Sequence, residues 1–273
     1  MSTRAATAEE PTTARSDPYR PIADARALRA LYAVQLAPIV ALHERIARRL
    51  AEPLNVAGAR ERIAAGHIAF DPRVVLACAG NLVPAFVDAT FALEDAGLIS
   101  GAVATAVRAR AASVYLLLGS WASGELRSYD DVTAVSRYAA SLVGRAVLRH
   151  ASEVARRGEA VVRGWPHPHC PCCGGAPDLA LTSDGEEWRT LACVRCDTMW
   201  LTDRPGCLGC GEEEPPSVVR ISVVSQLGYQ LIICNPCARY IKQGPLVPTE
   251  SLLVERTILT AVDAAAKRRG LRF

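Results

Sequence analysis

Lysine is almost missing from this chain. Only Lys242 and Lys267 accompany a large excess of arginine and alanine, a bias that we attribute to a GC-rich genome. The 31 basic and 28 acidic residues leave a formal net charge of +3. So small a charge creates no general electrostatic field toward nucleic acid or membrane surfaces. We therefore expect no nucleic-acid partner on the basis of charge.

Long hydrophobic runs are also missing. The longest, such as Ala111 to Ala122, are interrupted by polar residues and fall short of the roughly 20 residues that span a membrane. Residues 1–10 contain no apolar stretch and do not read as a signal peptide. We therefore expect a cytoplasmic protein with no membrane insertion. Its 273 residues, 50% of them apolar, suffice for one large or two modest domains.

Recognisable catalytic motifs are also missing from the sequence. No histidine stands with a serine or cysteine in a recognisable triad context, and no glycine-rich phosphate loop is present. The pair Gly119-Ser120 lacks the surrounding motif of a hydrolase. The sequence therefore predicts a protein that is not an enzyme.

Cysteine, by contrast, is concentrated in one segment. Nine of the ten cysteines lie between residues 170 and 237. Eight of them form four Cys-x-x-Cys pairs: Cys170/Cys173, Cys193/Cys196, Cys207/Cys210 and Cys234/Cys237. Two thiolates separated by two residues can lie on one tight turn and bind the same tetrahedral cation. The pattern predicts two metal ions, each bound by four cysteines. Zinc and iron both accept this ligand set.

The spacing of the pairs indicates which of them share a metal. Nineteen residues (174–192) separate the first pair from the second, and twenty-three (211–233) separate the third from the fourth. Each interval is long enough for a β-hairpin, whereas only ten residues (197–206) separate the second and third pairs. We therefore favour two tandem rubredoxin-like ribbons over a nested arrangement, in which the outer and inner pairs would form separate sites.

Both inserts carry hairpin patterns. In the first, Asp178 to Thr182 and Glu187 to Leu191 flank an Asp-Gly dipeptide, which is a strong turn signal between extended runs. In the second, the β-branched run from Val218 to Val224 precedes an expected turn near Leu227-Gly228. The two ribbons thus follow the same design.

Single residues near the cysteine pairs carry further predictions. Gly174 and Gly211 directly follow paired cysteines, where a positive φ turns backbone N–H groups toward the sulfur atoms. Cys172 lies between paired cysteines and is interpreted as a bystander thiol. Cys78 stands beside apolar residues and is predicted to be a buried small hydrophobe.

Helical patterns occupy most of the remaining chain. The four predicted helices run over residues 21–53, 71–97, 100–123 and 130–158. Asp71 should cap the second helix and Pro84 should kink it. A last helix is expected to begin at Pro248 and to end at Gly270.

The predicted fold class is α+β. An N-terminal all-α helical bundle precedes two tandem rubredoxin-like (zinc-ribbon) domains and a C-terminal helix. The expected boundaries are a flexible tail (1–20), the helical domain (21–163), the first ribbon (164–206), the second ribbon (207–247) and the C-terminal helix (248–273).

Other roles for the cysteines fit less well. A disulfide framework needs an oxidising compartment, which the absence of a signal peptide argues against. A thioredoxin-like motif is a single pair that opens a helix, whereas these pairs are bracketed by strands and turns. His167 and His169 invite a metal interpretation, but four complete thiolate pairs leave them no vacancy. We interpret both as linker residues.

The residues around the cysteines are more specific than the spacing. Three motifs occur in order: Cys170-Pro-x-Cys173-Gly174, then Cys193-x-x-Cys196-x-x-x-Trp200-x-x-x-Arg204-x-x-Cys207-x-x-Cys210-Gly211, then Cys234-x-x-Cys237-x-x-Tyr240-x-Lys242. This order resembles the formate dehydrogenase accessory protein family, FdhE. The resemblance covers residues 168–243 closely.

The resemblance implies a cytoplasmic maturation factor without catalytic activity of its own. Such a factor would bind the catalytic subunit of a molybdenum- or tungsten-dependent formate dehydrogenase, and its rubredoxin-type sites can bind iron. Trp200, Arg204, Tyr240 and Lys242 match family positions. They are expected either to contact the partner or, more simply, to cover the ribbons and offset thiolate charge.

Two further functions stay open. A zinc-ribbon protein that binds nucleic acid is one, because several arginines lie within the ribbons, although acidic residues interrupt the basic stripe that phosphate binding needs. A rubredoxin-like electron carrier with two reducible iron sites is the other. Nothing in the pattern indicates an oligomeric state.

Overall fold

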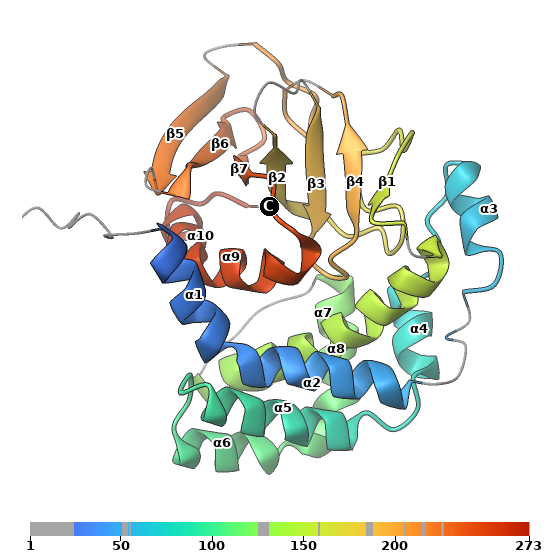
Figure 1. Cartoon of the computed structure of the whole chain (residues 1–273), viewed down its shortest axis with the longest axis vertical. Helices are drawn as coiled ribbons and strands as arrows, with labels where there is room; N and C mark the ends of the chain where they lie inside the picture. Colours follow the sequence, from blue (N-terminus) through green and yellow to red (C-terminus); the bar gives the residue numbers. More distant parts are fainter. Residues whose placement is uncertain are drawn as a thin grey trace, which may run out of the picture.

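A computed structural model gives the fold of most of the chain (Figure 1). It describes residues 25–50, 54, 56–124, 131–157, 159–183, 188–204, 206–214, 217–224 and 227–272. The tail expected at residues 1–20 and the Asp-Gly turn at residues 184–185 lie outside this part of the chain. The described residues form a mixed helix and sheet structure, so the predicted α+β class is confirmed.

The first part of the described chain is helical. Its elements are α1 (Ala25–Gln35), α2 (Ala37–Arg49), α3 (Ala59–Ala64), α4 (Pro72–Cys78), α5 (Val83–Asp95), α6 (Gly101–Arg108), the 3-10 helix η1 (Ala111–Ser113), α7 (Val114–Ser123) and α8 (Asp131–Arg156). Helix α8 contacts every α-helix from α2 to α7. It is therefore the central element around which the others pack (Figure 1).

Proline begins helices here rather than kinking them. Pro38, Pro72 and Pro84 each lie in the first turn of a helix, where the missing N–H group leaves no hydrogen bond unmade. The predicted 71–97 helix is therefore two helices, α4 and α5, whose axes differ by 102°. Asp71 caps α4 as predicted, because its Oδ1 accepts a hydrogen bond of 2.8 Å from the backbone N–H of Arg73.

The prediction that Cys78 is buried was wrong. Helix α4 has only seven residues and turns Val75 and Leu76 toward the core. Val74 and Cys78 lie on the opposite side of the same helix and are exposed. With so few turns, the apolar pattern of the sequence does not reveal which side faces inward.

The second part of the described chain contributes a seven-stranded sheet with the order β1-β4-β3-β2-β7-β6-β5. Its strands are β1 (Val161–Val162), β2 (Pro177–Thr182), β3 (Arg189–Cys193), β4 (Met199–Thr202), β5 (Val218–Val224), β6 (Tyr229–Cys234) and β7 (Arg239–Pro245). Both predicted hairpins are present, because β2 pairs antiparallel with β3 and β5 pairs antiparallel with β6.

The two hairpin units share one sheet, which the sequence analysis did not foresee. Strand β2 of the first unit pairs in parallel with β7 of the second, with Leu179 opposite Lys242 and Thr182 opposite Pro245. A parallel pair needs a long connection. Here the connection consists of β3, β4, β5 and β6, so the sheet closes only after the second unit has formed.

The C-terminal segment packs against the sheet. It forms the 3-10 helix η3 (Thr249–Ser251), α9 (Leu252–Ile258) and α10 (Thr260–Arg268), which lie between the sheet and α2 in Figure 1. Leu252 and Leu259 join Leu179 and Tyr229 in a buried cluster under these helices. The single C-terminal helix that we predicted is thus broken at Leu259, and it covers strands of both units.

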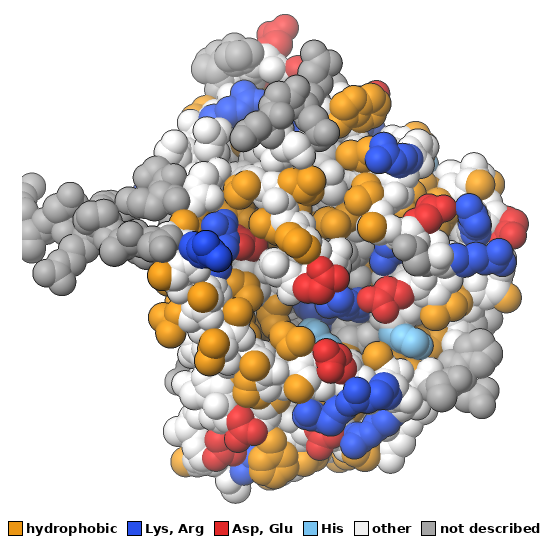
Figure 2. All heavy atoms as spheres, viewed as in Figure 1, with side chains coloured by type: hydrophobic (Ala, Val, Ile, Leu, Met, Phe, Trp, Pro, Cys, Tyr) orange, Lys and Arg blue, Asp and Glu red, His pale blue; other side chains and the backbone are white. Residues whose placement is uncertain are grey.

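Helix α1 is unusual because none of its residues is fully buried. It is attached to α9 by an ion pair of 2.6 Å between Arg29 Nε and Glu255 Oε1. Its outer side exposes Leu31 by 65% and Val34 by 76%. Figure 2 shows hydrophobic side chains gathered over this region.

The length and the apolar character of the described helices bear on whether they could span a membrane. None of them alone has both the length and the apolar character of a membrane span. Three bent pairs of consecutive helices meet those two requirements jointly.

One hydrophobic core connects the helices to the first hairpin unit. Phe86 and Leu142 from the helical part belong to the same buried cluster as Trp165, Cys170 and Trp200. Packing alone therefore does not separate the parts on either side of residue 164. Whether the helical part folds independently stays a prediction.

A pair of glycines provides a test of the contact between α7 and α8. A Cβ atom at buried Gly144 would lie 2.8 Å from Cε3 of Trp121 and 3.0 Å from Cδ2 of Leu118. We expect Gly144→Ala to lower the free energy of unfolding by about 1–3 kcal/mol because of this overlap. Gly119 in α7 faces open space, so Gly119→Ala should raise it by about 0.5–1 kcal/mol. Urea unfolding followed by circular dichroism compares the two, and equal stabilisation by both changes would contradict the described contact.

Candidate metal centres

The first four-cysteine group is assembled from two turns. Cys170 and Cys173 lie on the loop before β2, and Cys193 ends β3 with Cys196 on the following turn. Their Sγ atoms lie within 4.8 Å of one another. The closest approaches are 3.5 Å between Cys170 and Cys196 and 3.5 Å between Cys173 and Cys193. We call this group the first site.

The second group repeats this arrangement. Cys207, Cys210, Cys234 and Cys237 also have Sγ atoms within 4.8 Å of one another. Cys207 lies 3.6 Å from Cys237, and Cys210 lies 3.5 Å from Cys234. We call this group the second site. The geometry therefore agrees with the tandem pairing and not with the nested one.

Both groups have the size that a four-coordinate metal requires. A tetrahedral ion with metal–sulfur distances of about 2.3 Å places its sulfur atoms about 3.8 Å apart. The shortest separations here, 3.5–3.6 Å, are close to that value. Thiolate sulfur suits zinc and iron alike. The eight cysteines thus fit two tetrahedral metal ions, and the donor set is compatible with either metal.

The backbone after each pair turns in the same way. Gly174 and Gly211 have φ values of 68° and 80°, as predicted from their positions. Asp197 and Ala238 occupy the equivalent positions after the other two pairs, with φ values of 56° and 53°. A left-handed conformation costs a residue with a side chain roughly 1–2 kcal/mol. The signal for these two turns was their position after a Cys-x-x-Cys pair, since the residue type did not reveal it.

These turns aim backbone donors at sulfur. The N–H of Arg195 donates to Cys193 Sγ at 3.3 Å, and the N–H of Gly209 donates to Cys207 Sγ at 3.2 Å. Such bonds stabilise the thiolate form, which is the form that binds a metal.

The pKa values reflect this environment. Burial raises the pKa of Cys170, but hydrogen bonds with the thiols of Cys172 and Cys173 lower it to about 6. Burial also opposes ionisation of Cys207, yet the backbone N–H groups of Cys210 and Gly209 lower its pKa to about 7. Each site therefore offers one thiolate near neutral pH to an incoming cation.

Burial distinguishes the two sites. Each cysteine of the first site is no more than 2% exposed. At the second site Cys207 and Cys234 are buried, whereas Cys210 is exposed and Cys237 is half-buried. The first site is enclosed by protein, and the second is open to solvent on one side.

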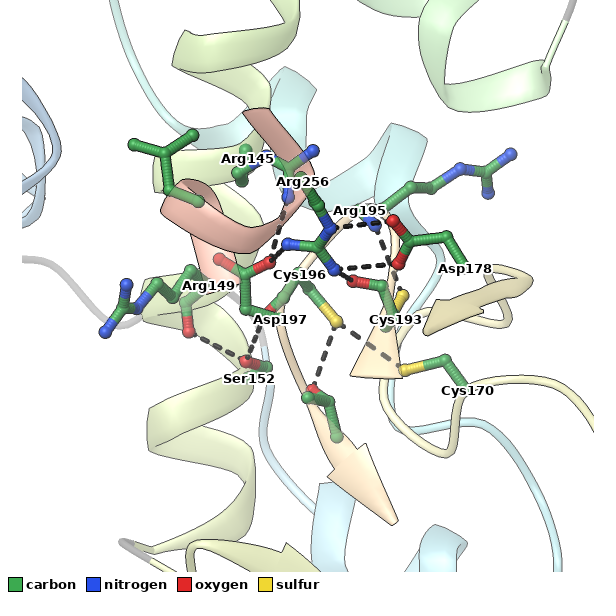
Figure 3. A network of polar contacts seen from close by, with 12 residues as sticks. Arg145, Arg149, Ser152, Cys170, Asp178, Cys193, Arg195, Cys196, Asp197 and Arg256 are labelled. Atoms are coloured by element: carbon green, nitrogen blue, oxygen red, sulfur yellow. Dashed lines mark hydrogen bonds and ion pairs between the residues drawn. The ribbon is translucent and has the colours of Figure 1, made fainter. Parts of the chain in front are cut away.

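A buried ionic network surrounds the first site (Figure 3). Arg256 of α9 donates to both carboxylate oxygens of Asp178 at 2.8 and 2.9 Å. It also bonds Asp197 Oδ1 at 2.5 Å and the backbone oxygen of Cys193 at 2.8 Å. Arg145 of α8 reaches the same oxygen of Asp197 at 2.9 Å. The network thus ties two helices to a cysteine turn.

Electrostatics keep this network charged. Burial raises the pKa of Asp197, but Arg256 and Arg145 lower it to about 2. Burial likewise disfavours the charged form of Arg256, yet Asp178 and Asp197 raise its pKa above the ordinary value. These residues could not be predicted from the sequence, because the members of the network are far apart in the chain. The one indication of this network in the sequence was an acidic residue, Asp197, directly after Cys196.

The proposed partner surface is not supported by burial. Trp200 and Lys242 are 0% exposed and Tyr240 is 4% exposed, so none of the three forms an exposed surface. Lys242 Nζ lies 2.7 Å from Asp263 Oδ2 and 3.8 Å from Asp178 Oδ2, and Tyr240 donates to Asp263 Oδ1 at 3.0 Å. The side chains of Tyr240 and Lys242 therefore extend from β7 toward α10. Arg204 is exposed and stays a candidate.

The remaining candidates lie close to the first site. Cys172 is buried beside Cys170 but does not belong to either four-cysteine group, as predicted. His167 and His169 stack on each other with ring centroids 5.0 Å apart, and Trp165 meets both rings edge-on. Neither histidine joins a metal group among the described residues.

Two cavities accompany the sites. A cleft of about 310 Å³ separates the loop of the first site from the second, with Cys207, Cys234 and Arg239 among its walls. A hollow of about 210 Å³ between α2, α8 and η3 is lined by His43, Glu44 and other charged residues. Figure 2 shows acidic and histidine side chains around this hollow. Among the described residues, only the cysteine groups bring three ligand atoms within 4.8 Å.

Comparison with known proteins finds a relative in sequence and a neighbour in structure. The Protein FdhE homolog of Aquifex aeolicus (strain VF5) is 37% identical over 82 residues. The match covers 29% of this chain and 29% of that relative, so it spans less than a third of either protein. In fold, the chain matches the crystal structure of the FdhE protein from Pseudomonas aeruginosa with a TM-score of 0.57. The chain is therefore similar in sequence to an FdhE homolog over those 82 residues, and its fold is similar to that of an FdhE protein.

The two comparisons complement each other. The likeness to the Pseudomonas FdhE structure covers 89% of this chain and 93% of that protein. Its sequence identity is 19%, so it concerns the fold alone. No family model matches the chain. The resemblance to FdhE is therefore supported by a relative that is similar in sequence over part of the chain, and the neighbour in structure adds the likeness in fold.

Proposed function

We propose that this chain is a cytoplasmic accessory factor that matures a molybdenum- or tungsten-dependent formate dehydrogenase by binding its catalytic subunit. The observation that supports this proposal most strongly is the pair of four-cysteine groups, which lie within sequence motifs that resemble those of FdhE. In this proposal the protein acts by binding and not by catalysis. A helical bundle at residues 21–163 supports two rubredoxin-like ribbons, which the C-terminal helices hold together.

The eight cysteines would bind two metal ions, zinc or iron. Bound metal cross-links the two turns of each ribbon, and iron would in addition allow one-electron chemistry. The chain's own residues position these turns. Arg256 and Ser152 bond the carbonyl oxygens of Cys193 and Cys196, at 2.8 and 3.3 Å, and so fix the first site to α9 and α8.

Burial of three of the four expected contact residues moves the test of partner binding to Arg204. Its side chain is exposed, and its backbone oxygen accepts a hydrogen bond from Arg189. Reversing its charge alters the rim of a possible interface without disturbing the buried network. Exposed rim charges mainly influence the rate and selectivity of association.

Deletion and capture experiments test the proposal. We expect deletion of the protein to lower active formate dehydrogenase while the amount of synthesised catalytic subunit, measured by immunoblot, stays unchanged. Tagged wild-type protein should recover that subunit from cell extract, and Arg204→Glu should recover several-fold less with both metals still bound. Arg48→Glu, an exposed change on α2, serves as the matched control. Failure to recover any formate dehydrogenase subunit would overturn the proposed function.

A further inference from the structure

The two sites differ in what holds them in place. The loop of the first site accepts backbone hydrogen bonds from Ala69 to Pro171 at 2.8 Å and from Phe70 to Cys172 at 3.0 Å. Its other turn is fixed by Arg256 and by Ser152, whose side chains bond the carbonyl oxygens of Cys193 and Cys196. Three separate parts of the fold therefore enclose this site. A ligand exchange there requires the core itself to open.

The second site has much less support. Its last turn is covered by Arg272, whose N–H donates to Ala238 O at 2.9 Å and whose Nε donates to Cys237 O at 3.3 Å. Among the described residues no buried ion pair adjoins this site. Cys210 is an exposed residue, so this ligand lies at the protein surface.

The cleft provides a second approach to the same site. Cys207 and Cys234 form part of its wall, together with the apolar side chains of Leu208, Val218 and Ile232. Its volume of about 310 Å³ lies at the lower end of the range of about 300–1,000 Å³ typical of ligand sites. The second site therefore has one exposed cysteine, Cys210, one half-buried cysteine, Cys237, and two cysteines that line a cleft large enough for a small ligand.

We propose that the second site is an exchangeable metal site that trades its cysteine ligands for external thiolates, whereas the first site holds its metal permanently. Thiolate is the appropriate ligand class because it matches the four sulfur donors already present. With a metal bound, Cys210 would be the ligand that an incoming thiol replaces. The proton of that thiol would pass to the Cys210 sulfur, so the exchange would need no oxidant or reductant. The inference rests on the proposed function only in requiring that both sites bind metal.

Metal release from the purified protein tests the proposal without any formate dehydrogenase. Protein loaded with two zinc ions is mixed with free cysteine and a metallochromic indicator, and release is followed by absorbance. We expect one equivalent to leave at least about ten times faster than the other, at a rate that rises with thiol concentration. Release of both ions at one rate, or a rate independent of thiol, would overturn the assignment.

Alkylation of the wild-type protein identifies which site releases its metal. No metal ligand needs to be replaced for this experiment. During the fast phase N-ethylmaleimide should label Cys210 and Cys237, while Cys193 and Cys196 stay protected, as read by peptide mass spectrometry. Cys78 is exposed and outside both sites, so it gives the unhindered labelling rate. Early labelling of the first site instead would contradict the proposal.

Two tryptophan substitutions on β5 test the route through the cleft. Val218 lines the cleft, whereas Ile221 on the same strand does not and is exposed. We expect Val218→Trp to slow the fast phase several-fold and Ile221→Trp to leave it unchanged. The assay is then repeated with a Cys-x-x-Cys peptide in place of cysteine. If the peptide accelerates metal release more than cysteine does, the external ligand is a protein thiol; if cysteine accelerates it more, the ligand is a small thiol. An equal rate in both variants would exclude the cleft as a route.

Discussion

Replacing Cys193 with serine should remove one metal ion and unfold more than one ribbon. The reason is that the first site belongs to the same hydrophobic core as the helices. Structural zinc contributes apparent binding free energies of about 10–16 kcal/mol, and a unit as small as one ribbon has little core of its own. We therefore expect one metal per chain and a marked loss of helical signal on heating, measured by elemental analysis and circular dichroism.

The matching change at the second site should have a narrower effect. Cys234→Ser is expected to remove one metal as well, but to leave the helical transition near its wild-type temperature, because Cys210 is exposed and Cys237 half-buried at that site. Cys78→Ser is the control, since this cysteine is exposed and belongs to neither group. It should retain two ions and wild-type stability. Two ions bound in either ligand variant would contradict the assignment of ligands.

Arg256→Met should be the most destabilising substitution outside the cysteines. Arg256 pairs with the carboxylates of both Asp178 and Asp197. The substitution leaves these two negative charges buried without the positive charge that Arg256 supplies to both. Removing one partner of a buried ion pair typically costs about 3–5 kcal/mol. We expect a loss of that order in the free energy of unfolding, measured by chemical denaturation of the metal-loaded protein.

An exposed ion pair provides the comparison. Arg49 contacts Asp88 at 3.1 Å on the surface, and its side chain is 59% exposed. Arg49→Met should cost at most about 1 kcal/mol, since solvent screens such pairs. Adding Asp178→Asn to Arg256→Met should restore part of the loss by removing one uncompensated charge. If both arginine variants lose the same small amount, the network contributes no more than a surface pair.

Local features of the fold were predicted well from the sequence. The grouping of the cysteines, the two hairpins, the cap at Asp71 and the turns at Gly174 and Gly211 all follow from residues close together in the chain. In each case a few neighbouring residues fix the geometry. A Cys-x-x-Cys turn or an Asp-Pro start needs no distant partner to be recognised.

Distant contacts could not be predicted in the same way. Lys242 was expected to contact a partner protein or to offset the charge of the thiolates, yet it pairs with Asp178 on β2 and Asp263 on α10. The parallel pairing of β2 with β7 leaves no turn signal, because the strands are not consecutive. The buried network around Arg256 has the same origin. Its charges balance only once three remote segments have come together.

The parallel contact between β2 and β7 also sets an order of events during synthesis. Strand β2 leaves the ribosome early but must wait for β7, and the whole second ribbon is made in between. Each hairpin pairs strands that are neighbours in the chain, β2 with β3 and β5 with β6, so it can form before that wait ends. Closing the sheet then buries Lys242, whose partner Asp263 is made later still. A nascent chain with a faulty second ribbon would therefore leave the edge of β2 unpaired and open to quality-control factors.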